Sequence, residues 1–276
     1  MTKARALPLL AASVLAIAGC SAPDTETMEA RFTDSPGVTE ATARCDEPLP
    51  LSYECSVTVS VAREITPEHL ANVLDSGRLA GANADVSVQV QREFTDAHHF
   101  YLEFARDGAF NADLDDEQLA TLFVDGVASP HVTIFGLESR DAATGEDGRA
   151  PVLFEIDYTT VPVEQRKPGA PEPLPPSAQV SDAMAAADMV LEAIPHAEGV
   201  VRADALHLEM ESGLYPAAEI ALYDAIVARF PVSIGYLGNG SVRLRLEPTA
   251  DVAAAQAFAE QQSSYASIPT VVIDVG

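Results

Sequence analysis

The chain of 276 residues carries 42 acidic against 16 basic side chains, a formal net charge of −26 at pH 7, and 47% of its residues are hydrophobic. This balance argues against nucleic-acid binding, which depends on Lys and Arg to neutralise phosphates, and it leaves no polybasic patch for anionic lipid headgroups. The hydrophobic content is ample for packed cores, whereas the lack of tryptophan argues against an aromatic platform for carbohydrates.

The N-terminal segment has the layout of an export signal. Lys3 and Arg5 precede an apolar run over residues 6–18. A short positive segment followed by roughly 7–15 apolar residues is typical of secretory signals. The run is shorter than the about 20 apolar residues that span a bilayer, so we expect export and not a membrane-spanning helix.

The run ends in Ile17-Ala18-Gly19-Cys20, which resembles the lipobox of bacterial lipoproteins. The resemblance implies removal of a signal peptide of residues 1–19 and diacylglycerol on the Cys20 sulfur. The mature chain would then be an extracytoplasmic lipoprotein, anchored to the bacterial cell membrane through Cys20. Two acyl chains anchor stably, because each buried methylene contributes about 0.8 kcal/mol. An ordinary signal peptide is the alternative.

The next segment, 20–43, is polar and has no apolar period, and it predicts a flexible, lipidated tether. Once Cys20 carries lipid, Cys45 and Cys55 remain as an even pair. In an oxidising compartment such a pair predicts a disulfide, here closing the loop 46–54. A redox or metal role is the alternative, but no CxxC spacing supports it.

Six of the seventeen residues in 161–177 are proline. Such a segment favours extended polyproline geometry and predicts a semi-rigid linker. It would separate a domain of residues 44–160 from a domain of residues 178–276, each large enough to fold alone. A ligand for a proline-recognition module is the alternative.

Alternating hydrophobicity and helix-start residues predict the elements of the first domain. Thr66-Pro67 starts one helix, with Thr as N-cap and Pro at the first helical position, and acidic residues 113–116 start another. Strands are predicted at 56–62, 86–91, 100–104, 132–137 and 152–158.

The second domain shows a related order. Gly238-Asn239-Gly240 between two apolar strands predicts a hairpin, and Thr249 or Asp251 caps the last helix. Helices are predicted at about 181–193, 216–229 and 251–262, and strands at 200–210, 232–237, 242–246 and 270–275.

Both domains contain the order strand, helix, strand, strand, helix, strand. This order resembles the ferredoxin-like βαββαβ sandwich, in which helices cover one face of an antiparallel sheet. We therefore predict an α+β protein with two tandem small domains of this kind.

The sequence offers few candidates for chemistry. Adjacent strand residues such as His98 and His99 point to opposite faces, so they do not easily share a metal ion. The acidic stretch 111–117 lacks the Gly and Glu of a calcium-binding EF-hand loop, and acids in a first helical turn are explained by the helix dipole. Calcium at this stretch, or at Asp141, Glu146 and Asp147, is the alternative. The other histidines, without ligand spacing, are His69, His131, His196 and His207.

Nucleophile and phosphate-binding motifs are missing from the sequence: there is no GxSxG, GxGxxG or GxxxxGK[ST], and no SxxK in either predicted domain. We assign no catalytic, cofactor-binding or metal-binding residue. The favoured hypothesis is a non-enzymatic envelope lipoprotein that engages a protein partner. The alternatives are a small-ligand-binding, transport-associated lipoprotein and a metal-dependent hydrolase with an unrecognised site.

Overall fold

A computed structural model describes residues 24–49, 52–81, 85–90, 99–104, 114–139, 152–158, 172, 175–211 and 214–276. The predicted signal peptide and Cys20 lie outside these residues. Within the described ranges, no helix combines the length and the apolar character needed to cross a bilayer.

The described helices are α1 (Thr25–Thr33), α2 (Pro67–Gly81), α3 (Asp116–Gly126), α4 (Pro176–Ala193), α5 (Ala217–Val227) and α6 (Val252–Ala259). The strands are β1 (Val38–Leu49), β2 (Ser52–Val61), β3 (Asp85–Val90), β4 (His99–Phe104), β5 (Ile134–Ser139), β6 (Val152–Asp157), β7 (Glu198–Ala203), β8 (Leu206–Met210), β9 (Val232–Gly238), β10 (Ser241–Leu246) and β11 (Thr270–Val275).

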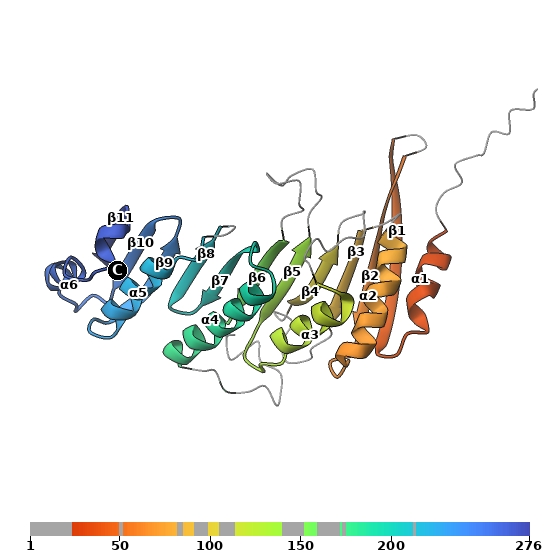
Figure 1. The fold of residues 1–276 in the computed structure, drawn as a ribbon, viewed down its shortest axis with the longest axis horizontal. Coiled ribbons are helices and arrows are strands. Elements are labelled where there is room, and N and C mark those ends of the chain that lie inside the picture. Colours follow the sequence, from red (N-terminus) through yellow and green to blue (C-terminus); the bar gives the residue numbers. More distant parts are fainter. Residues whose placement is uncertain are drawn as a thin grey trace, which may run out of the picture.

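The strands lie in one sheet in the same order as in the sequence, from β1 to β11. Five antiparallel hairpins follow one another along the sheet: β1–β2, β3–β4, β5–β6, β7–β8 and β9–β10. The second strand of each hairpin runs parallel to the next strand, and one helix makes that crossover. Because parallel neighbours need such a crossover, the chain repeats a helix–strand–strand unit along the sheet (Figure 1).

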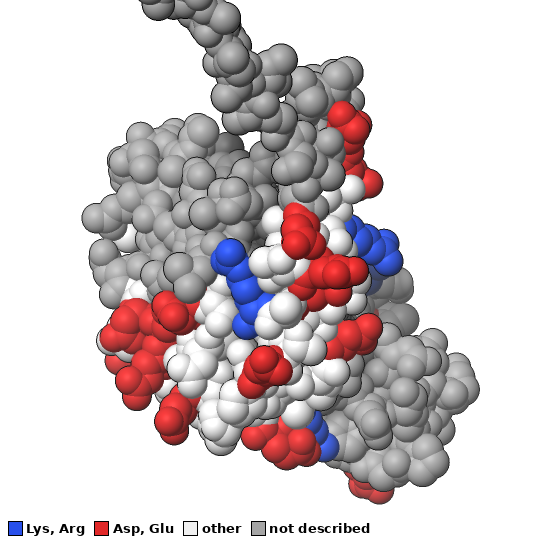
Figure 2. Space-filling model, turned by 90° about the vertical axis from the view of Figure 1, so that its right-hand side faces the viewer, with Lys and Arg blue, Asp and Glu red and all other residues white. Residues whose placement is uncertain are grey.

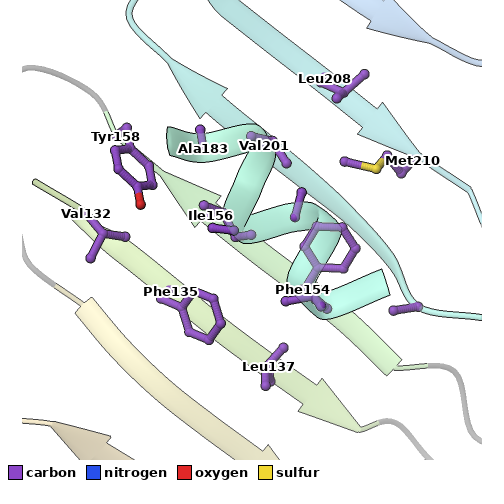
Figure 3. Packing of buried hydrophobic residues seen from close by; sticks show 14 of the residues in the cluster. Val132, Phe135, Leu137, Phe154, Ile156, Tyr158, Ala183, Val201, Leu208 and Met210 are labelled. Atoms are coloured by element: carbon purple, nitrogen blue, oxygen red, sulfur yellow. The ribbon is translucent and has the colours of Figure 1, made fainter. Parts of the chain in front are cut away.

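One face of the sheet carries the core. Figure 1 shows α2, α3, α4 and α5 on the same side of the strands. Alternate strand residues point toward these helices, as the two-residue period of a strand requires. In Figure 3, Phe135 of β5, Phe154 of β6, Val201 of β7 and Leu208 of β8 form one continuous layer with Ala183 of α4.

The α+β class is confirmed, but the two ferredoxin-like units are not. In that split arrangement another strand lies between the parallel strands that a helix connects. Here each helix from α2 to α6 joins strands that are direct neighbours, and the strand order is sequential. The predicted list of elements does not specify strand order, because order is decided by which strands meet in space.

The predicted linker 161–177 lies mostly outside the described residues. On either side of it, β6 and β7 are paired from Leu153↔Glu198 to Asp157↔Arg202, so the sheet continues across this point. Helix α4 already begins at Pro176, with proline at the first helical turn, before the predicted start at residue 181. That residues 44–160 and 178–276 form two domains, each able to fold alone, stays a prediction.

Residues 24–43, the described part of the predicted flexible tether 20–43, form α1 and the beginning of β1, and here the structure corrects the sequence analysis. Asp24 caps α1, and Phe32 on this helix is 0% exposed. The carboxylate of Glu29 accepts a 2.8 Å hydrogen bond from the backbone N–H of Ala43 on β1. The prediction was wrong because α1 buries little besides Phe32, so its polar majority hides the helical period.

A second correction concerns the predicted strand 200–210. It is the hairpin of β7 and β8, which turns at Asp204-Ala205. No glycine or proline marks this turn, and Asp204 alone is a weak turn signal. The hairpin at Gly238-Asn239-Gly240 is confirmed, and Asp251 is the N-cap of α6.

Cys45 and Cys55 are at disulfide distance, and their Cα atoms are 4.0 Å apart. They are register partners of the β1–β2 hairpin, so the bond cross-links two neighbouring strands. The predicted pair is therefore present, and it joins two strands of one hairpin where the sequence predicted a closed loop over 46–54.

Replacing both cysteines by alanine should lower the free energy of unfolding by about 2–3 kcal/mol, because the cross-link restricts the unfolded chain. Urea unfolding followed by circular dichroism measures this loss. A reducing agent should move the wild-type midpoint to that of the variant and leave the variant unchanged. A wild-type midpoint that does not respond to the reducing agent would contradict the prediction.

Candidate binding face

The second face of the sheet carries polar and aromatic side chains, and no described helix packs on it. Strand register places eight of these residues in one row across the sheet, from β4 to β11. The members of this first row are His99, Ile134, Asp157, Arg202, His207, Tyr236, Arg243 and Val272. A second row beside it, from β4 to β8, contains Tyr101, Gly136, Glu155, Val200 and Glu209.

The centre of the face is a hydrogen-bonded network around Arg202 on β7. Its guanidinium pairs with the carboxylate of Glu155 on β6 and lies 3.9 Å from that of Asp157. The Tyr101 hydroxyl donates a 3.1 Å hydrogen bond to Glu155. One arginine thus holds two carboxylates of the neighbouring strand, which lowers the negative charge of this part of the face.

Gly136 allows the Tyr101 side chain to reach Glu155. The two residues are register partners on β4 and β5, and any side chain on Gly136 would overlap the tyrosine ring. Burial, reinforced by the charge of Glu155, raises the pKa of the Tyr101 hydroxyl. The hydroxyl therefore stays protonated at neutral pH and remains a donor to Glu155.

The C-terminal part of the face forms a groove over β8 to β11, with a volume of about 600 Å³. On its floor, the His207 ring lies 5.6 Å from the Tyr236 ring, and the His207 Nε2 is 3.2 Å from a carboxylate oxygen of Glu209. Tyr236 is 47% exposed, and Val272 on β11 is 43% exposed. The groove thus combines apolar surface with charged groups at its sides.

The rim of this β8–β11 groove includes Asn239, at the turn between β9 and β10. Asn239 has φ of 55° and Gly240 has φ of 70°. Positive φ at both central residues is the requirement of a type I′ turn, which favours Asn-Gly. This turn fixes the register that places Tyr236 directly opposite Arg243.

Charge is distributed unevenly over the molecule. At the end formed by α1 and β1, acidic side chains are spread over the described surface with a few basic ones between them (Figure 2). Residues 178–276 carry four basic side chains, of which Arg202, Arg243 and Arg245 lie on the second face of the sheet. Three of the four basic side chains of 178–276 are therefore on this face.

The candidates for metal binding that lie in the described part of the chain are not brought together. His99 lies exposed on β4 with its ring 4.7 Å from that of Tyr101. Asp115 is the N-cap of α3 and forms a capping box with Gln118, so its position at the start of the helix is explained without a bound ion. Within the described ranges, no three His, Cys, Asp or Glu side chains are grouped to hold a metal. The candidates outside those ranges are His98, Asn111, Asp113, Asp141, Glu146 and Asp147.

Sequence reasoning missed the residues of the network and of the groove. Arg243 and Arg245 were part of the predicted strand 242–246, where their alternation with Val242, Leu244 and Leu246 marks one polar face. That signal identifies an exposed face but not its neighbours. The residues suit recognition: two carboxylates held by an arginine, a histidine beside an exposed tyrosine, and two exposed arginines. Comparison with protein-family models, curated proteins and solved structures found no match to this chain.

Proposed function

We propose that the protein is an extracytoplasmic lipoprotein, anchored through Cys20, whose second sheet face binds a protein partner without catalysing a reaction. The observation that carries the proposal is the first row, a series of register partners extending over eight strands. Protein interfaces are enriched in aromatic and arginine side chains, and the first row contains Tyr236, Arg202 and Arg243.

The anchor and the location rest on the lipobox-like residues Ile17-Ala18-Gly19-Cys20. The Cys45–Cys55 pair is compatible with an oxidising compartment, where disulfides persist. The extent of the first row over eight strands favours a macromolecule, because small-molecule sites bury most of the ligand surface in a concave pocket. The second candidate function, capture of a small ligand for a transporter, is supported only by the β8–β11 groove. No described residue favours the hydrolase alternative.

The proposal is tested by photo-cross-linking in the native cells. A photoreactive amino acid replaces Tyr236 in the first row or, as control, Ala253, which is exposed on α6. We expect one specific cross-linked protein from position 236 and none from position 253, because only the first position lies on the proposed interface. Equal products from both positions, or none from either, would count against a protein partner.

The anchor has its own test in the same cells. A Cys20→Ser variant lacks the thiol that would carry diacylglycerol, so it should leave the membrane fraction and appear in the soluble extracytoplasmic fraction. Retention of this variant in the membrane fraction would reject lipid on Cys20 as the anchor.

A further inference from the structure

The β8–β11 groove contains two arginine side chains that face it from a single strand. Arg243 and Arg245 are two residues apart on β10, so both point to the second face, roughly 7 Å from each other along the strand. Both are exposed, and neither forms a hydrogen bond through its guanidinium or an ion pair with a described residue. In the same face, Arg202 is held by Glu155 and Asp157.

The acidic groups that face the groove are Glu209 and Asp274. A carboxylate oxygen of Glu209 lies 3.2 Å from the Nε2 of His207. Asp274 is the register partner of Arg245 on β11, and its charge partly offsets that arginine. Arg243 differs, because its register partners are Tyr236 and Val272, and neither is an acidic residue.

Arg243 is therefore a guanidinium between two exposed apolar side chains, in a chain with 42 acids and only 16 bases. A guanidinium presents two parallel N–H donors that match a carboxylate, and such charge-assisted bonds are the strong ones. Tyr236 and Val272 supply flat and aliphatic surface on either side of it. The groove is lined by residues of four neighbouring strands, which suits a short extended segment of chain.

We propose that the β8–β11 groove binds an acidic peptide segment of a protein partner, with a carboxylate of that segment on Arg243 and its backbone or apolar atoms against Tyr236 and Val272. This inference rests on the proposed function and adds the chemistry of the partner. The net charge of the chain opposes an acidic ligand at long range, but physiological salt screens charges beyond about 8 Å. Contact with Arg243 acts within that distance.

The test uses the mature protein and a fluorescently labelled short peptide of alternating glutamate and alanine, followed by fluorescence anisotropy. The matched control variant is Arg44→Gln, which removes the same charge from an exposed position on β1 of the same face. We expect Arg243→Gln to weaken binding by about tenfold or more, and Arg44→Gln by less than about twofold. The glutamine version of the peptide should bind as weakly as the Arg243→Gln variant binds the acidic one.

Three results would overturn the inference. The first is no binding of the acidic peptide, and the second is equal loss in Arg243→Gln and Arg44→Gln. The third is full displacement of the peptide by inorganic phosphate at equal charge concentration, which would make the site one for small anions. A cross-link from position 236 combined with any of these results would leave the protein partner in place and remove only its acidic character.

Discussion

Replacing Phe32 by alanine should lower the free energy of unfolding by about 3 to 5 kcal/mol, although the residue lies in a segment that looks like a tether. Phe32 is fully buried, and its helix packs against β1, β2 and α2. Removing a buried aromatic ring loses its transfer free energy and leaves a cavity. For a chain of this size, the melting temperature should fall by roughly 6 to 20 °C.

Thermal and urea unfolding followed by circular dichroism would measure the effect of Phe32→Ala. The control is Glu26→Ala, since Glu26 is exposed on the first turn of the same helix and should change stability by less than about 0.5 kcal/mol. A loss below about 1 kcal/mol in Phe32→Ala would mean that α1 is dispensable and that the fold begins later in the chain.

The second large effect is expected at Phe154, where the two predicted domains meet. Phe154 on β6 is 3% exposed and belongs to the core layer of Figure 3. Its ring lies close to Gly199, its register partner on β7. Phe154→Ala should cost about 3 to 5 kcal/mol. Since the core continues from β6 to β7, the loss should also reach the C-terminal half, as it does between neighbouring units of repeat proteins.

A single tryptophan makes this second prediction measurable, because the chain contains none. Tyr215→Trp places the probe in the C-terminal half at an exposed site. Its urea midpoint should fall when Phe154→Ala is added, and should fall clearly less for Leu153→Ala, which removes a half-buried side chain from the opposite face of β6. If the urea midpoint followed by tryptophan fluorescence stayed unchanged while the midpoint followed by circular dichroism fell, the two halves would be independent domains.

The hydrogen-bonded network around Arg202 shows why the candidate site was less predictable than the helices and strands. Tyr101 and Glu155 are 54 residues apart in sequence, and Arg202 is 47 residues from Glu155. Each residue alone reads as an ordinary exposed strand position. Their meeting depends on the register of β4 to β7, and a shift of one residue in any strand would move its side chain to the other face.

Local features of this protein were determined by the sequence itself, because each depends on residues a few positions apart. They include the α+β class, the Asn239-Gly240 turn, the Asp251 cap and most of the strands and helices. Only the tertiary structure decided the strand order, the continuity of β6 with β7 and the place of α1. These features depend on which apolar faces pack against one another across long stretches of chain. The hydrophobic effect is non-directional, so the local pattern shows that a face is apolar but does not show its partner. The polar rows on the second face follow from the same packing, since the helices cover one side of the sheet and the register aligns what remains on the other.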